Sequence, residues 1–226
     1  MIIPVLIVMG IVFKWNINPK RTVYSLGRMF SQLLLIGYFL TYIFNSDNSW
    51  IIITILILML IISSWIALGC IKKDRLALFS RAFFSITLGG GTILLLVSVC
   101  VLRLNPWYLP KYIIPLAGMI FANAMNSISL AAERIKSELS RGVEYDQAFK
   151  IAYSTSLIPI INSLFAVGIV SIPGMMTGQI LSGISPLIAA RYQIMVMCMI
   201  FGGNGISSAL FLIITKSKFL TNFKKI

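Results

Sequence analysis

The stretch WIIITILILMLIISSWIALGCI, residues Trp50–Ile71, decides the fold class of this chain. It contains no charged residue, and a helix of about 20 apolar residues crosses the ~30 Å hydrocarbon core of a bilayer. Backbone groups in lipid must form hydrogen bonds within their own segment, so we expect a helix here. The strands of a membrane β-barrel would alternate apolar and polar residues, and this stretch does not.

Further apolar segments accompany it, at Met1–Phe13, Leu26–Phe44, Ala82–Leu102, Tyr112–Ala132, Leu157–Ile172 and Tyr192–Thr215. The first is short, and it lacks the basic region and small-residue cleavage site of a signal peptide. Charged residues make up only 11% of the chain, against about 25% in soluble proteins. The sequence therefore predicts an all-α polytopic membrane helix bundle of about seven transmembrane helices, with residues 1–226 forming one membrane domain.

Basic residues are sorted to one side of these segments. If the spans alternate in direction, sixteen of the nineteen Lys and Arg residues lie on one face: Lys14, Lys20, Arg21, Arg28, Lys72, Lys73, Arg75, Arg81, Arg134, Lys136, Arg141, Lys150, Lys216, Lys218, Lys224 and Lys225. The other face has only Arg103, Lys111 and Arg191. The positive-inside rule then predicts an outside N-terminus and a cytoplasmic C-terminus. We interpret the net charge of +13 as a signal that sets the membrane topology and attracts the chain to anionic lipid, and we expect no nucleic-acid partner.

Several kinds of chemistry are missing from the apolar segments. The chain has no histidine, Asp47 falls in an external turn, and the other acidic residues fall in the cytoplasmic regions. We therefore predict no catalytic residues and no metal site of its own. Cys70, Cys100 and Cys198 lie on three different spans and show no metal-ligand or disulfide spacing. No G-x-x-x-x-G-K-[ST] pattern is present, so ATP and Mg²⁺ would bind to a partner subunit and this chain would not be an enzyme itself.

One polar stretch, Glu133–Ser156, is long enough to form an organised cytoplasmic element. Apolar residues recur at helical spacing on both sides of Gly142, a residue suited to end a helix. We expect two short amphipathic helices at the cytoplasmic surface. They would either lie on lipid headgroups or dock a soluble partner.

Polar and small residues inside the spans suggest a pathway or a helix interface. Asn123 and Asn126 lie in the fifth span, where an amide needs a partner or water. Gly89, Gly90 and Gly91 would permit close approach of helices in the fourth span. Pro173 and Gly174 are expected to break the sixth helix, and Ile172–Gly183 would then be an interrupted or re-entrant helix or an external loop.

Two blocks of sequence carry a family resemblance. The first is Ile114-Pro115-Leu116-Ala117-Gly118-Met119-Ile120, followed by Asn123-Ala124-Met125. The second is Val167 to Gly178, VGIVSIPGMMTG, followed by Gly183, Pro186 and Tyr192-Gln193-Ile194-Met195-Val196. With Gly27-Arg28, Gln32-Leu33 and Gly37-Tyr38, they resemble the FetB-type (YbbM-type) ABC transporter permeases, a family associated with metal resistance.

The resemblance implies a permease subunit in the bacterial cytoplasmic (inner) membrane that pairs with an ABC ATP-binding subunit, with two copies of each. Bacterial members are associated with iron export, and plant relatives with aluminium tolerance and nucleotide-sugar transport. The segment 133–156 would be the coupling element, with the candidate residues Glu138, Leu139, Arg141, Gly142, Tyr145 and Phe149. The candidates for the substrate path are Met119, Asn123, Asn126, Met175, Met176 and Gln179.

Three alternatives remain open from the sequence. A stand-alone channel or facilitator would need only the small, Met-lined helix faces. An ABC permease could carry a non-metal substrate such as a nucleotide sugar. A membrane scaffold without transport activity would tolerate replacement of Asn123 and Asn126 by leucine.

Overall fold

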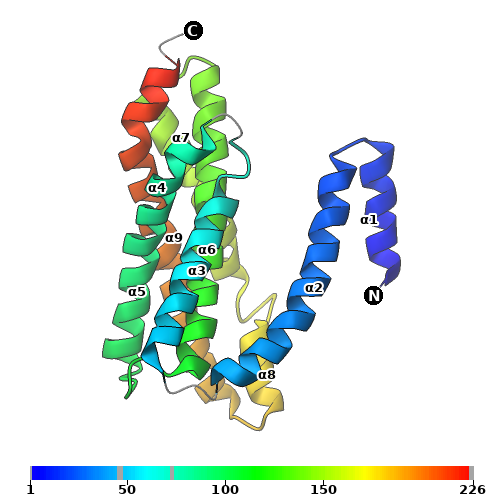
Figure 1. Cartoon of the computed structure of the whole chain (residues 1–226), viewed down its shortest axis with the longest axis vertical. Coiled ribbons are helices and arrows are strands. Elements are labelled where there is room, and N and C mark those ends of the chain that lie inside the picture. Colours follow the sequence, from blue (N-terminus) through cyan, green and yellow to red (C-terminus); the bar gives the residue numbers. More distant parts are fainter. Residues whose placement is uncertain (1, 45–47, 72–73, 224–226) are drawn as a thin grey trace. The chain divides into compact units, whose positions relative to one another are not determined.

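The computed structural model of the chain describes residues 2–44, 48–71 and 74–223. All regular elements in these ranges are helices, joined by turns and one isolated bridge between Val167 and Ser171. Internal contacts divide the chain into two units, Met1–Asp47 and Asn48–Ile226. Figure 1 shows the helices of both, and the prediction of one membrane domain over 1–226 remains a prediction.

The N-terminal unit is a pair of helices, α1 (Ile2–Lys14) and α2 (Pro19–Phe44). The turn between them places Asn16 and Asn18 at positive φ, a conformation that asparagine adopts more readily than most residues. At 1.5 Å per residue, α1 is about 20 Å long, so the expectation of a short first helix is confirmed. α2 begins seven residues before the predicted Leu26, because its first two turns are polar but still helical.

The second unit contains the remaining helices. They are α3 (Ser49–Ala67), α4 (Arg75–Ile86), the π-helix η1 (Thr87–Gly91), α5 (Thr92–Leu95), the π-helix η2 (Leu96–Val101), α6 (Pro110–Ser140), α7 (Tyr145–Ala166), α8 (Gly174–Leu181) and α9 (Pro186–Phe223). The elements from α4 to η2 follow one another without a break and form a single membrane-length helix, Arg75–Val101.

Five helices of the described residues are long and apolar enough to cross a membrane. They are α2, α3, Arg75–Val101, α6 and α9, and each corresponds to one of the five long spans predicted from the sequence. α3 ends at Ala67, four residues before the predicted Ile71. The chain is therefore a multi-pass membrane protein with a helical bundle. The total of about seven spans and the N-out orientation remain predictions.

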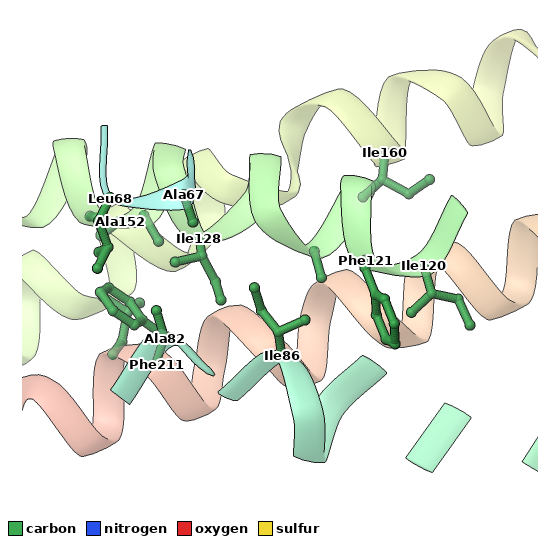
Figure 2. Packing of buried hydrophobic residues seen from close by; sticks show 14 of the residues in the cluster. Ala67, Leu68, Ala82, Ile86, Ile120, Phe121, Ile128, Ala152, Ile160 and Phe211 are labelled. Carbon is green, nitrogen blue, oxygen red and sulfur yellow. The ribbon is translucent and has the colours of Figure 1, made fainter. Parts of the chain in front are cut away.

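The core of the second unit lies where α6 packs against α9, α7, α3 and the α4–η2 helix. Figure 2 shows Ile120, Phe121 and Ile128 along α6, with Ile86 of α4 between Ile128 and Phe121 in this view and Phe211 of α9 beside Ala82. These side chains are all buried, at 3% exposure or less. α6 is thus the central helix of the second unit.

Glycines allow two of these helices to touch through their backbones. A Cβ added to Gly89 of η1 would lie 2.7 Å from the backbone nitrogen of Ser207 in α9. A Cβ added to Gly90 would lie 2.9 Å from the Ile120 side chain, whereas one added to Gly91 would meet nothing within 4 Å. The predicted close approach is therefore confirmed for Gly89 and Gly90 but is wrong for Gly91.

Pairwise contacts give the direction of each helix. Met59 of α3 contacts Gly118 of α6, and Cys70, three residues beyond the end of α3, contacts Ser129 of α6, so these two helices are parallel. Gly89 and Ile93 contact Ser207 and Gly202, so the Arg75–Val101 helix runs opposite to α9. The start of α4, the turn between α6 and α7, and the end of α9 therefore share one end of the bundle (Figure 1), as the sorting of basic residues requires.

The prediction of two short cytoplasmic helices between Glu133 and Ser156 is wrong. Glu133–Ser140 continues α6, and Tyr145–Ser156 begins α7. The predicted break at Gly142 is confirmed: its φ is +81°, and Val143 N donates to Glu138 O while Gly142 N donates to Leu139 O. This is the Schellman arrangement that a left-handed glycine makes possible.

The sixth predicted span also ends earlier than expected. α7 stops at Ala166, before the predicted break at Pro173 and Gly174. Gly168, with a φ of +87°, turns the backbone there, and Val170 and Ser171 both donate to the Ala166 carbonyl. A short helix, α8, then begins after Pro173, so the predicted interruption is present but starts one helical turn or more upstream. The small and polar residues at 202–208 stay helical within α9.

Candidate functional site

A small polar cavity lies among α6, α7 and α9. Its volume is about 80 Å³, and it is lined by Asn123, Asn126, Ser127, Leu130, Ser156, Pro159, Ile160, Ser163 and Asn204. Three asparagine amides and three serine hydroxyls therefore converge within the apolar part of the bundle. The predicted path residues Asn123 and Asn126 both belong to this cavity, which we call the polar cavity.

Hydrogen bonds hold most of its polar groups in place. Asn123 Nδ2 donates to the Met119 carbonyl at 2.8 Å, and Ser127 Oγ donates to the Ser156 carbonyl at 3.2 Å. Asn204 differs, because it is 5% exposed and its amide oxygen has no hydrogen-bond partner in the described residues. A buried acceptor without a partner costs about 1–3 kcal/mol, so this amide is a candidate for contact with cargo.

A second, larger cavity adjoins the first. It has a volume of about 360 Å³ and is lined by Met119, Ser163, Val167, Ser171, Pro173, Gly174, Met175, Gln193, Val196, Met197 and Ile200. Ser163 lines both cavities. Three methionines contribute thioethers to this second space, which we call the thioether cavity.

The two cavities follow one another along the bundle. On α6, Met119 of the thioether cavity precedes Asn126 of the polar cavity in the direction of the α6–α7 turn. On α9, Gln193 of the thioether cavity likewise precedes Asn204 of the polar cavity, in the direction of the end of α9 that lies beside this turn. The polar cavity is therefore nearer to the basic end of the bundle, and the thioether cavity is nearer to α8.

The remaining path candidates are placed less centrally. Met176 lines a neighbouring cavity of about 300 Å³, which shares Gln193 and Met197 with the thioether cavity. Gln179 is half-buried, and its amide oxygen has no hydrogen-bond partner among the residues that the structure describes, but it lines none of these cavities. The structure thus brings together Met119, Asn123, Asn126 and Met175 and leaves Gln179 apart.

Sequence reasoning missed Gln193, Asn204 and Met197 as site residues. Gln193 is 6% exposed, and its amide oxygen also lacks a partner in the described residues. An amide inside an apolar run was the signal that identified Asn123, and the same signal was present at Asn204. Met197 has no such signal, because one methionine in α9 cannot be told from another without the packing.

The coupling candidates divide into buried and exposed residues. Glu138, Leu139 and Tyr145 are buried, and Phe149 is half-buried. Arg141 and Gly142 are exposed at the turn. The apolar stripes of this segment therefore pack into the bundle, and a role of the six residues in coupling to an ATP-binding subunit remains a prediction.

The buried candidates hold the turn in position. Glu138 lies between Arg134 of its own helix and Arg141 of the following turn, with Oε1 at 2.8 Å from Arg134 Nη2 and 3.8 Å from Arg141 Nη1. The 2.8 Å contact is an ion pair whose angles do not fit a hydrogen bond. Tyr145 Oη donates to the Leu212 carbonyl of α9 at 2.6 Å. Burial, together with the charge of Asp146, raises the pKa of Tyr145 to about 12.

No group of three or more His, Cys, Asp or Glu residues that could hold a metal ion occurs within 2–44, 48–71 and 74–223. The cavities instead offer amide oxygens, hydroxyls and thioethers. Thioethers are soft donors that favour ions such as Cu(I), whereas amide and hydroxyl oxygens are hard donors.

Comparison with known proteins identifies relatives along most of the chain. The sequence pattern of the uncharacterised protein family UPF0014 matches residues 1–220. The chain is 39% identical to "UPF0014 membrane protein slr1647" of Synechocystis sp., covering 80% of this chain and 76% of the relative. It is 34% identical to the "Probable iron export permease protein FetB" of Escherichia coli, covering 88% and 82%. It is 31% identical to "Protein ALUMINUM SENSITIVE 3" of Arabidopsis thaliana, covering 90% and 80%. No solved structure matches the chain.

Proposed function

Because this chain belongs to the UPF0014 family, we propose that it is the membrane-spanning permease subunit of an ABC transporter that exports iron or a related metal. One structural observation carries this proposal. α6 and α7 line the cavities along their apolar parts, and the same two helices continue without a break to the exposed turn around Gly142. A partner that moves the turn would therefore move the cavity walls.

The energy source would be a separate ATP-binding subunit. The chain contains no P-loop pattern, so ATP and Mg²⁺ would be held by the partner. The proposed docking surface consists of the exposed residues at the turn, and the charged ones among them include both signs. These residues are Lys136, Ser140, Arg141, Gly142, Glu144, Asp146, Gln147 and Lys150. This surface replaces the buried residues Glu138, Leu139 and Tyr145 in the proposed contact.

Movement would pass from the turn to the cavities through contacts between α7 and α9. Tyr145 Oη bonds to Leu212, and Lys216 Nζ lies 2.9 Å from Asp146 Oδ1, so the start of α7 and the end of α9 are tied together. Closure of the ATP-binding subunits would tilt α7 and α9 against α6. Access would then alternate: the polar cavity would open toward the basic end in one state, and the thioether cavity would open toward the opposite end in the other.

The proposed setting is the bacterial inner membrane, with the basic end of the bundle in the cytoplasm. Two permease chains would assemble with two ATP-binding subunits. In this orientation the cargo of an exporter enters at the polar cavity and leaves through the thioether cavity.

Co-purification of the chain with its candidate ATP-binding subunit tests the proposal. We expect a stable complex whose ATP turnover in nanodiscs changes when Fe²⁺ or another metal cargo is added. Arg141→Glu should weaken the complex, because it reverses an exposed charge at the turn. Arg191→Glu is the matched control, since Arg191 is an exposed arginine near the start of α9, at the opposite end.

Two results would overturn the proposal. A purified chain that moves metal across vesicles without any ATPase is a channel or facilitator. Equal loss of the complex with Arg141→Glu and Arg191→Glu would show that the turn is not the docking surface.

A further inference from the structure

The thioether cavity brings together one methionine from each of three helices. Met119 comes from α6, Met175 from α8 and Met197 from α9. We propose that this cavity binds a soft monovalent cation, Cu(I) being the biological example, through these three thioethers. The inference rests on the proposed function and narrows the metal that the permease would carry.

The donors in the cavity determine the class of ion. Its lining contains thioethers, serine hydroxyls and one amide, and it contains no carboxylate, imidazole or thiol. Thioethers are soft ligands that select Cu(I), whereas Fe²⁺ and Mn²⁺ favour imidazole and carboxylate oxygen. This donor set is therefore matched to a soft ion.

The absence of charge in the lining determines the valence. The cost of moving an ion out of water scales with the square of its charge, so a divalent ion pays about four times the cost of a monovalent one. A carboxylate would offset that cost, but the lining of both cavities is formally neutral. A monovalent ion is the cation that a neutral cavity can accept most readily.

Gln193 gives an independent indication that something binds here. Its side chain lines the cavity, is 6% exposed, and has an amide oxygen without a hydrogen-bond partner in the described residues. Buried amides normally satisfy their oxygens. A cation, or a water that remains bound to it, would supply the missing partner.

The size and flexibility of the site suit transport better than storage. The cavity volume of about 360 Å³ exceeds the space of one bare ion, and methionine side chains have three rotatable bonds with which to follow an ion. Translocation requires binding that is strong enough for entry and weak enough for release. The adjoining polar cavity, with its amides and hydroxyls, would supply a weaker oxygen-lined station on the cytoplasmic side.

Competition with the Cu(I) chelator bathocuproine disulfonate, under anaerobic reducing conditions, measures the proposed affinity. The full chain is used in nanodiscs with Cys70, Cys100 and Cys198 replaced by alanine, because thiols also bind Cu(I). We expect Met119→Leu, Met175→Leu and Met197→Leu each to weaken Cu(I) binding at least about tenfold, since even indirect support of a metal is worth 10–100-fold. The triple variant should lose the site.

The controls are Met195→Leu and Met199→Leu. Both residues lie on α9 beside Met197, and neither lines a described cavity. Leucine conserves the volume of methionine, so all variants should keep the elution volume and thermal midpoint of the parent. X-ray absorption of the bound copper, with sulfur neighbours lost only in the cavity variants, gives a second readout.

The inference is overturned if the triple variant binds Cu(I) as tightly as the parent. It is also overturned if the control variants weaken binding equally, or if Fe²⁺ binds in a methionine-dependent manner and Cu(I) does not. Its failure differs from failure of the proposed function. A chain that forms an active complex with its ATPase but shows no methionine-dependent Cu(I) binding refutes the inference alone. Methionine-dependent binding without any ATPase complex refutes the ABC assignment alone.

Discussion

The contact between Gly89 and Ser207 gives the sharpest test of the helix packing. Gly89→Ala would place a Cβ at 2.7 Å from Ser207 N and 2.8 Å from Ser207 Cα, both backbone atoms of α9. Ordinary contact begins at 3.4 Å, so the helices would have to separate by 3.4 − 2.7 = 0.7 Å or 3.4 − 2.8 = 0.6 Å. Backbone atoms cannot move aside as a flexible side chain can.

The expected cost follows from two opposing effects. Overpacking of a well-packed core costs about 1–3 kcal/mol. Replacing glycine by alanine inside a helix returns about 0.5–1 kcal/mol. Because both close contacts are with backbone atoms, the upper part of the overpacking range applies, about 2–3 kcal/mol. We therefore expect Gly89→Ala to lower the free energy of unfolding by about 1–2.5 kcal/mol, and the thermal midpoint by about 2–10 °C for a unit of this size.

Gly91→Ala is the matched control in the same π-helical segment. A Cβ at Gly91 would meet nothing within 4 Å, so this variant should equal the parent or gain up to about 1 kcal/mol. The assay is thermal unfolding in one detergent, followed by tryptophan fluorescence and by the monodisperse fraction in gel filtration. Equal stability of the two variants, or a Gly89→Ala protein as stable as the parent, would refute the close approach of η1 and α9.

Three further predictions concern polar groups. Tyr145→Phe should cost about 1 kcal/mol through loss of the bond to the Leu212 carbonyl. Because the pKa of Tyr145 is raised from 10.0 to about 12, its stabilising effect is complete below pH 10 and is lost as the pH rises through 12. An unfolding series from pH 8 to 12 should therefore show a steeper decline in the parent than in the phenylalanine variant. Glu138→Gln should cost about 1–3 kcal/mol in chemical denaturation, because it removes the buried charged partner of Arg134, which is itself 37% exposed. An unchanged midpoint would show that the ion pair of Glu138 with Arg134 does not stabilise the end of α6. Asn204→Leu should leave stability unchanged or higher, because it removes an unpartnered buried amide oxygen, yet it should reduce transport in vesicles; full transport would exclude Asn204 from the path.

The membrane-spanning helices could be predicted from the sequence because their signals are local. A run such as Trp50–Ile71 has to be helical in lipid, whatever its neighbours are. The turn at Gly142 was equally predictable, since the left-handed backbone that ends α6 suits glycine. The turn at Gly168 carries the same signal, but Pro173 was the stronger breaker and drew the predicted boundary past the true one.

The continuation of α6 to Ser140 was not predictable from hydropathy. Its last turns are polar on the outside, while Ile135 and Leu139 are buried against the rest of the bundle. The burial of Glu138 was missed for the same reason, because only the packed structure shows that its own arginines flank it on a covered face. Residues expected to face a partner therefore turned out to hold the turn from within.

The sequence by itself determined that the chain is a helical membrane protein, which helices are long enough to span, and which end carries the basic residues, because each depends on the composition of one short segment. The tertiary structure alone decided which polar side chains meet. Ser127, Ser156 and Asn204 are far apart in the chain, and they line one cavity only because α6, α7 and α9 pack together. Met119, Met175 and Met197 look like any other methionines until that packing places them around one space. A site built from several helices depends on the rotation and offset of each helix, and these quantities are set by packing across the whole core.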